Sequence, residues 1–135
     1  MVSCQAGNGR PGPSSGQVGV GLVALVVVTR YVVPADESAV FHERAREALD
    51  ALRLQPGCRR SHVGRSMDEP KRWLLQTEWD TVGAYRRGLS SYDVKVRAVP
   101  VMYHAIDEPT AYEALVEAGP TELVDRLSDR ADGAR

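Results

Sequence analysis

The sequence predicts one α+β domain, in which helices cover an antiparallel four-stranded sheet. Two segments, residues 22–33 and 72–79, are rich in apolar or β-branched residues and indicate strands. Residues 37–53 repeat apolar side chains at intervals of three and four, which indicates an amphipathic helix. With the turn residues between them, these segments predict the order strand, helix, strand, strand, helix, strand.

The first strand is expected at residues 22–33, because Pro34 and the residue after it break the apolar run. Asp36 then offers a side-chain oxygen as the N-cap of a helix over residues 37–53. The apolar stripe of this helix is Phe41, Ala45, Ala48, Leu49 and Leu52. A Gln-Pro-Gly sequence at residues 55–57 ends it.

The two middle strands are expected at residues 58–67 and 72–79, joined by an Asp-Glu-Pro turn into a hairpin. The second of them opens the stretch WLLQTEWDTVGAYRRGLS, residues 73–90, which holds both tryptophans. Alternation in this strand places Trp73 and Trp79 on the same side as Leu75 and Thr77.

The second helix is expected to begin near Thr81, whose hydroxyl can cap it, and to be interrupted at Ser90 and Ser91. Residues 93–99 can continue as helix until Pro100 disturbs it. Residues 101–106 are ambiguous. A last strand is expected near residues 109–116, although residues 110–113 also match a capping box and leave a helix open there.

Domain boundaries follow from composition. Residues 1–20 are rich in Gly, Pro and Ser and are expected to form a disordered extension. The folded domain is expected at residues 21–117, followed at 118–135 by a flexible or weakly helical acidic tail with one helical turn near 122–127. The apolar run at residues 18–28 is too short to span a bilayer, so we interpret it as the approach to a buried strand.

Charge and cysteine content exclude several classes of function. A net charge of −1 gives no reason to expect nucleic acid or an anionic membrane as a partner. Two cysteines, Cys4 and Cys58, imply no disulfide framework, so a reduced, cytoplasmic setting is expected. Cys58 could be an activated thiol, since two arginines follow it, or a small buried side chain.

The predicted order of elements is the split βαβ pattern of a ferredoxin-like sandwich. All its helices pack on one face of the sheet, which leaves the other face open. An open apolar face predicts that a second copy covers it across a two-fold axis, giving a homodimeric α/β barrel.

The sequence resembles the antibiotic biosynthesis monooxygenase family of dimeric α+β barrel proteins, most closely its small actinobacterial members. The resemblance covers about residues 22–117 and is carried by the sequences VTRY at 28–31, PGC at 56–58, GRS at 64–66, W…TEW at 73–79, VGAYRR at 82–87 and DEP at 107–109. It implies a monooxygenase that oxidises an aromatic, phenolic, anthrone or quinol-like small molecule with no metal or flavin cofactor.

A haem-degrading branch of the same family carries an Asn, a Trp and a His at positions near Thr29, Gly88 and Ala98. None of the three is present, so haem binding or degradation is disfavoured. The three His and two Cys also lack the spacing of a metal site.

Residue types suggest a candidate site. His62 is the best general base because its pKa lies near neutrality, with His104 a weaker candidate. Arg30 or Arg86 could bind the developing oxyanion. The expected walls of the substrate pocket are Trp73, Trp79 and Tyr85.

Each of these assignments has a structural alternative. Arg30 would be buried in an apolar strand and could pair with Glu78 or Asp107. The aromatic residues could be plain core or cover a dimer seam. The second functional hypothesis is therefore a non-catalytic dimeric module that binds a ligand or a partner on the same fold.

Overall fold

The structure, a computed structural model, describes residues 23–127. The chain divides into two compact units, of which the larger is Val23–Ala114. Within the described part of the chain, the other unit consists of Leu115–Leu127. The predicted N-terminal extension, residues 1–20, lies outside the described residues.

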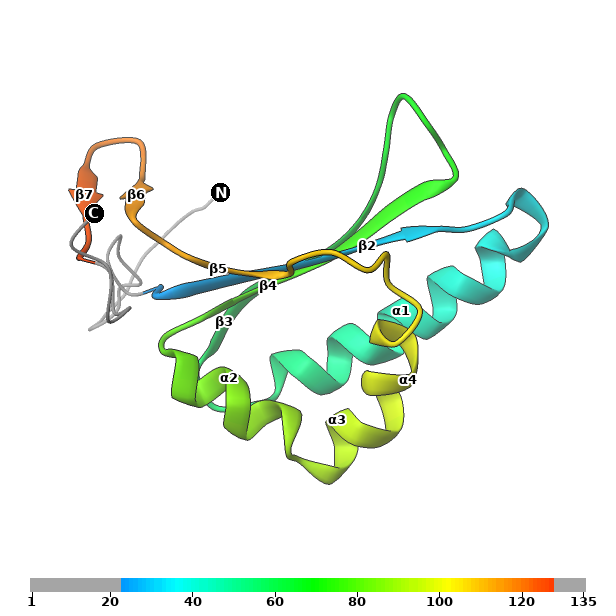
Figure 1. The fold of residues 1–135 in the computed structure, drawn as a ribbon, viewed down its shortest axis with the longest axis horizontal. Helices are drawn as coiled ribbons and strands as arrows, with labels where there is room; N and C mark the ends of the chain where they lie inside the picture. Colours follow the sequence, from blue (N-terminus) through cyan, green and yellow to red (C-terminus); the bar gives the residue numbers. More distant parts are fainter. Residues whose placement is uncertain (1–22, 128–135) are drawn as a thin grey trace, which may run out of the picture. The chain divides into compact units, whose positions relative to one another are not determined.

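The larger unit contains one antiparallel sheet in the order β3-β4-β2-β5 (Figure 1). Its strands are β2 (Leu25–Val32), β3 (Cys58–Arg65), β4 (Arg72–Trp79) and β5 (Ala111–Glu113). The register pairs Tyr31 with Trp73 at one end of the two central strands and Leu25 with Trp79 at the other. This arrangement confirms the ferredoxin-like α+β prediction.

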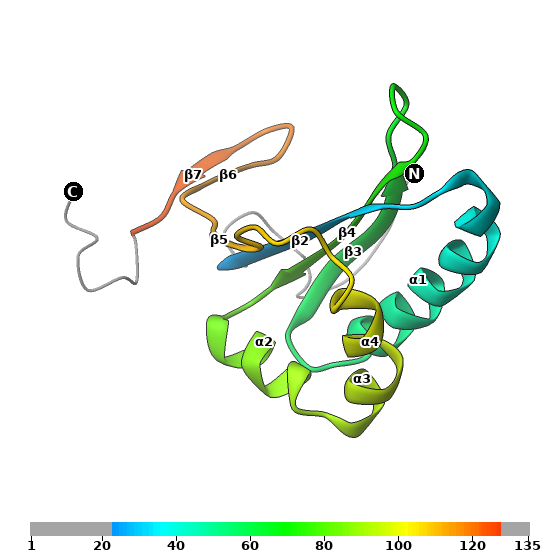
Figure 2. The same cartoon turned by 45° about the vertical axis from the view of Figure 1, so that its right-hand side comes forward.

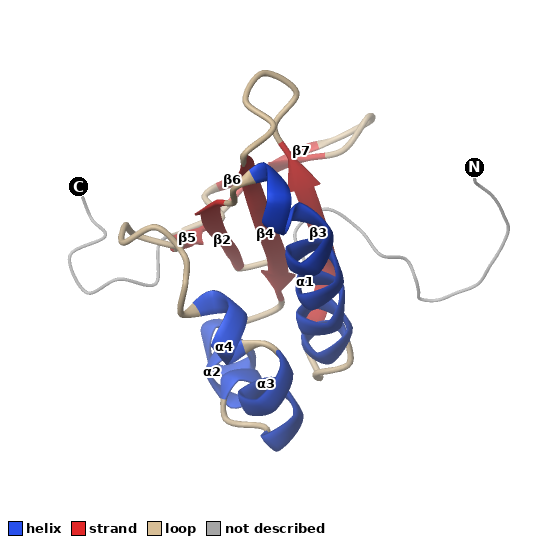
Figure 3. Ribbon diagram, turned by 90° about the vertical axis from the view of Figure 1, so that its right-hand side faces the viewer, coloured by secondary structure: helices blue, strands red, loops and turns tan. Residues whose placement is uncertain are grey.

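The helices of this unit all lie on one side of the sheet (Figures 1 and 3). They are the 3-10 helix η1 (Ala35–Glu37) and the α-helices α1 (Ser38–Arg53), α2 (Val82–Leu89), α3 (Tyr92–Arg97) and α4 (Val99–Met102). Figure 2 shows the short helices α3 and α4 beside the long helix α1, which both of them contact.

Helix boundaries follow local chemistry in several places. The Thr81 hydroxyl accepts the backbone N–H of Ala84 at 2.9 Å, which confirms the predicted cap of α2. The predicted interruption at Ser90 and Ser91 is also confirmed, because the Ser91 hydroxyl caps α3 by accepting the Val94 N–H at 3.2 Å. Pro100 sits in the first turn of α4, where its missing N–H leaves no helical hydrogen bond unmade.

Three details differ from the sequence predictions, and the segment left ambiguous, residues 101–106, is now defined. Asp36 caps no helix, because the chain after Pro34 enters η1 and the N-cap of α1 is Glu37, which makes no side-chain cap bond. The last strand of the sheet shrinks to Ala111–Glu113 and no helix forms there. Residues 101–106 begin inside α4 and continue as turns. Leu123–Asp125 is a strand, not a helical turn.

That last strand belongs to the smaller unit, which is an antiparallel hairpin. Its strands are β6 (Val116–Ala118) and β7 (Leu123–Asp125). The N–H of Gly119 donates to the carbonyl of Glu122 at 2.9 Å and closes the turn.

The two faces of the four-stranded sheet differ in burial. Along β2, every second residue from Leu25 to Tyr31 is buried under the helices. Val26 and Val28 face the other way and are half-buried, and Val32 on that face is exposed. The sheet therefore has one covered face and one open face in the single chain. No helix in residues 23–127 has the length and apolar character needed to cross a membrane.

Candidate functional site

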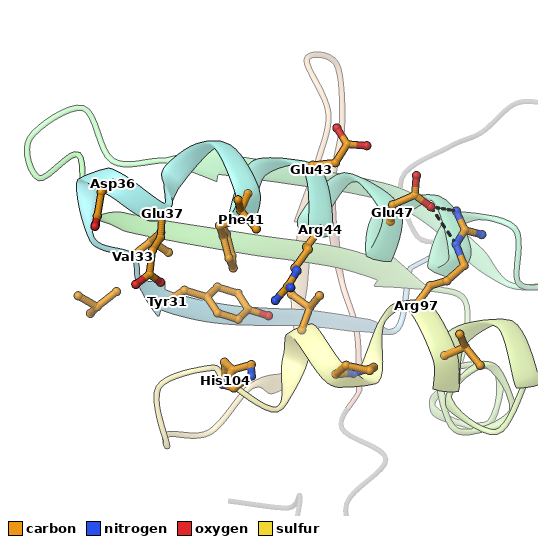
Figure 4. Close-up of a pocket in the computed structure, with 15 residues that line it drawn as sticks. Tyr31, Val33, Asp36, Glu37, Phe41, Glu43, Arg44, Glu47, Arg97 and His104 are labelled. Carbon is orange, nitrogen blue, oxygen red and sulfur yellow. Dashed lines mark hydrogen bonds and ion pairs between the residues drawn. The ribbon is translucent and has the colours of Figure 1, made fainter.

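A cleft of about 840 Å³ opens on the covered side of the sheet, at the end where β2 leads into α1. Such a volume lies within the range of small-molecule sites in proteins. Its lining residues come from the end of β2, from η1 and α1, and from α3 and α4 with the turn that follows (Figure 4). They are Tyr31, Val32, Val33, Asp36, Glu37, Val40, Phe41, Glu43, Arg44, Glu47, Val96, Arg97, Pro100, Val101 and His104.

Aromatic rings form the floor of the cleft. Tyr31 is 2% exposed, and its ring lies 5.0 Å from that of Phe41 between centroids. The Tyr31 hydroxyl lies 2.8 Å from the hydroxyl of Thr29, and either oxygen can be the donor in this pair. The Thr29 hydroxyl also lies 3.4 Å from the carbonyl oxygen of Leu75. Burial raises the pKa of Tyr31, so the phenol stays neutral at the base of the cleft.

Charged side chains line the walls. Arg97 of α3 binds Glu47 and Asp50 of α1 at 2.8 Å each and Asp93 at 2.9 Å, and this cluster ties α3 to α1 beside the cleft. These hydrogen-bonded carboxylates raise the pKa of Arg97. Arg44 of α1 makes no ion pair or hydrogen bond with any residue in the described part of the chain. Figure 4 shows its side chain descending from α1 toward α4.

His104 lies on the opposite wall, in the turn that follows α4. Its backbone N–H donates to the carbonyl of Val101, which fixes the turn against the last helix. His104 is exposed to solvent and lines the cleft. An imidazole and an unpaired guanidinium thus flank an aromatic floor.

The weaker base candidate, His104, lines the cleft, but the other predicted polar residues lie elsewhere. His62 points to the open face of the sheet beside Gln76, and Arg86 is exposed on α2. Arg30 also belongs to the open face, and its side chain is 52% exposed. The expectation of a buried Arg30 paired with Glu78 or Asp107 is therefore wrong. Alternation along β2 turns this side chain away from the core, and its bidentate partner is Glu108 at 2.7 Å.

The predicted aromatic walls fall into two separate groups on the covered face. Trp73 packs against Phe41, with ring centroids 5.3 Å apart, and Trp79 packs against Tyr85 at 5.5 Å. The indole N–H of Trp79 donates to the Thr77 hydroxyl at 2.8 Å. The structure does not bring the six predicted site residues together, and none of them lines the cleft.

Comparison with known proteins places the fold in a family. The family model described as antibiotic biosynthesis monooxygenase matches residues 24–96, more than half of the chain. The chain belongs to the antibiotic biosynthesis monooxygenase family. No curated protein matches it.

Solved structures similar to this family member share its fold at low sequence identity. SnoaB from Streptomyces nogalater, a cofactor-independent oxygenase solved as a mutant, aligns with a TM-score of 0.54 and 19% identity over 66% of this chain and 86% of its own. A protein from Nitrosomonas europaea, provisionally described as an antibiotic biosynthesis monooxygenase, aligns with a TM-score of 0.53 and 20% identity. The alignment covers 65% of this chain and 95% of that protein. A conserved protein from Methanosarcina mazei aligns with a TM-score of 0.57 and 19% identity, over 67% of this chain and 92% of its own.

The family match covers only part of the cleft. Residues 24–96 include the aromatic floor and the α1 wall. Arg97, Pro100, Val101 and His104 lie beyond the matched residues.

Sequence reasoning identified His104 as a weaker candidate and missed Phe41 and Arg44 as cleft residues. The sequence places Phe41 in the apolar stripe of its helix and suggests no role for Arg44. Their spacing of three places them on neighbouring parts of one helix surface. An arginine three positions after the only phenylalanine of the chain was the available signal.

Two further possibilities, an activated cysteine and a metal site, can be checked against the structure. Burial, followed by the nearby carboxylates Glu78 and Asp80, raises the pKa of Cys58 to about 11, so the alternative of an activated thiol is wrong. Within residues 23–127 no group of His, Cys, Asp and Glu could hold a metal ion.

Proposed function

We propose that this protein is a cofactor-independent monooxygenase that oxidises a small phenolic, anthrone or quinol-like molecule in the cleft between β2, α1 and α4. The observation that carries the proposal is the aromatic floor of Tyr31 and Phe41, with polar groups on both walls. Family membership supports an oxygenase, and SnoaB, a cofactor-independent oxygenase, shares the fold. A flat aromatic ring matches both the size and the surface of the cleft.

In the proposed reaction the substrate supplies all the electrons. A base removes an acidic proton from the substrate, and the resulting anion gives one electron to dioxygen. The substrate radical and superoxide combine, forming a carbon–oxygen bond, and proton uptake gives a hydroperoxide. Loss of water then converts a CH₂ group into a carbonyl, so that one oxygen atom enters the product and the other enters water.

The protein would assist at two steps. An apolar aromatic floor favours a delocalised anion, and a general base takes the proton. We assign the base to His104, because its imidazole faces the cleft. The sequence-derived set is a competing assignment. It has His62 as base, Arg30 or Arg86 as the oxyanion partner, and an aromatic pocket of Trp73, Trp79 and Tyr85.

Oxygen consumption with a panel of anthrones and hydroquinones tests the proposal. Wild type is expected to consume oxygen above the uncatalysed rate, and His104→Ala to lose about 10²-fold or more of kcat/KM. His62→Ala is the matched control and should keep wild-type activity. The reverse pattern would support the sequence-derived set. A wild-type rate equal to background on every compound that binds would favour the non-catalytic ligand-binding module.

The same proposal includes a cytoplasmic homodimer that forms through the open face of the sheet. Half-buried Val26, Val28 and Leu74 on that face support it, since a second copy would remove them from water. Light scattering after size-exclusion chromatography should report twice 14.7 kDa. Substituting Val28 by Glu should shift the protein toward monomer. A wild-type mass of one chain at micromolar concentration would contradict the dimer.

A further inference from the structure

We infer that the cleft selects aromatic substrates that carry a single carboxylate, and that Arg44 binds this group. The inference rests on the proposed function, because it names the substrate class of the same site. It starts from a difference between the two arginines that line the cleft.

Arg97 is saturated with partners. Three carboxylates, from Glu47, Asp50 and Asp93, bind its guanidinium at 2.8–2.9 Å. Its charge is neutralised and its donors point along the interface between α1 and α3. It is therefore a structural tie and has little left to offer a ligand.

Arg44 lines the same cleft with its donors free of partners in the described part of the chain. Figure 4 shows it directed from α1 toward α4, whereas the side chain of the preceding residue, Glu43, rises on the other side of the helix. A guanidinium presents a planar fork that binds a carboxylate through two parallel hydrogen bonds. The free fork is the strongest anion-binding group in the cleft.

The position of Arg44 relative to the floor sets the shape of the ligand. Arg44 follows Phe41 by about one helical turn, so its stem leaves α1 next to the aromatic ring. Phe41 in turn packs against Tyr31 at the base of the cleft, with the two rings tilted by 53°. A flat ring on this floor, with a carboxylate on one edge, would reach both surfaces at once.

Carboxylates at the rim limit the ligand to one negative charge. Asp36 and Glu37 line the cleft at the end where η1 lies, away from the Arg97 cluster (Figure 4). A second acidic group on the ligand would face them without a cation to offset the repulsion. Dianions and polyphosphates should therefore bind poorly, which separates this cleft from a general anion site.

Calorimetric titration with three probes tests the inference: 1-hydroxy-2-naphthoate, neutral 1-naphthol and the dianion naphthalene-2,3-dicarboxylate. Wild type should bind the hydroxynaphthoate about tenfold or more tightly than the naphthol, as expected for a charge-assisted bidentate pair. It should bind the dianion more weakly than the monoanion. In Arg44→Gln the preference for the monoanion should fall to nearly one, with naphthol affinity unchanged.

Arg46→Gln is the matched control, since Arg46 is an exposed arginine of the same helix that does not line the cleft. It should keep the wild-type preference. An unchanged preference in Arg44→Gln, or an equal loss in Arg46→Gln, would overturn the inference.

The two proposals fail in distinguishable ways. Loss of monoanion binding in Arg44→Gln, with no oxygen consumed by wild type on any compound that binds, would leave the ligand class standing and remove the monooxygenase. Equal oxygen consumption by wild type and Arg44→Gln on neutral and carboxylated anthrones would keep the monooxygenase and remove the role of Arg44.

Discussion

The two ends of the covered sheet face carry similar aromatic residues and differ in what surrounds them. At one end Trp79 is 0% exposed, its N–H is bonded to Thr77, and its ring packs against Tyr85 of α2. At the other end Trp73 packs against Phe41, and the indole N–H has no partner within the described residues. The first end is filled, and the second lies beside the cleft.

Glycines explain much of the difference. A Cβ on Gly88 would lie 2.9 Å from Cη2 of Trp79, and one on Gly57 would lie 2.5 Å from the Cβ of Ala84. Gly57 also has φ of +90°, which disfavours other residues. These two positions let α2 approach the sheet closely. Aromatic content alone therefore does not indicate a pocket, because the residues of the covering helix decide whether the space is filled.

Among the substitutions that test the difference between the two ends, Trp79→Ala should lower the free energy of unfolding the most. Removing a fully buried indole leaves a cavity under α2, so the free energy of unfolding should fall by about 3–5 kcal/mol. Urea denaturation followed by circular dichroism measures it. Trp73→Ala should be less destabilising, because Trp73 borders an open depression and its indole N–H makes no hydrogen bond within the described residues that would be lost. Equal losses would show that the two ends are packed alike.

Phe41→Leu probes the hollow end. The side chain is half-buried, so the free energy of unfolding should fall by less than about 1.5 kcal/mol. Affinity for 1-hydroxy-2-naphthoate should fall several-fold, since an aromatic contact is worth about 0.5–1.5 kcal/mol beyond its area. Calorimetry and urea denaturation on the same sample give both values. Unchanged affinity would argue against Phe41 as the floor.

Gly88→Ala tests the close approach of α2. Alanine favours a helix by about 1 kcal/mol over glycine, but overpacking against Trp79 costs about 1–3 kcal/mol. A net loss of about 1 kcal/mol is expected from thermal or urea unfolding. Gly64→Ala is the control, because its new Cβ would meet its nearest atoms, in Leu74, at an ordinary 3.7 Å. Its effect should stay within about 0.5 kcal/mol.

The Arg97 cluster should give the smallest effect, because its carboxylates are solvent-exposed. Hydrogen bonds from Arg97 and Arg53 lower the pKa of Asp50 in the folded state. Its stabilising contribution is complete above the unfolded-state pKa of about 3.9 and disappears as pH falls through the lower folded value. The urea midpoint should decline below about pH 4, and Arg97→Gln should flatten this decline. Arg46→Gln should leave it unchanged.

Much of the fold could be predicted, because its signals are local. Alternation identified β4, a hydroxyl before an apolar face identified the start of α2, and two serines marked its end. The prediction that Arg30 is buried was wrong. Apolar residues occupy both faces of β2, so the sequence of this strand did not indicate which face is covered. The C-terminal strands were short and carried conflicting helix signals, so their type was decided by pairing.

The cleft could not be predicted from residue types. Phe41 and Arg44 are neighbours on α1, and His104 joins them in one cleft because α4 packs against α1. Single-residue chemistry favoured His62, which the alternation of β3 places on the opposite face. The location of the candidate site depends on how the helices pack against each other, which residue types alone do not reveal.

The wall opposite α1 is made of short pieces, which are the end of α3, the four-residue helix Val99–Met102 with a proline inside it, and the turn that follows. The facing wall is a helix of 16 residues anchored to the core along its length. The wall opposite α1 should therefore tolerate changes in sequence better than α1 does. Replacements at the solvent-exposed positions of residues 99–104 should retune which molecules are accepted, whereas Val101 belongs to the core and should be kept. A library aimed at altered selectivity should begin at the exposed positions.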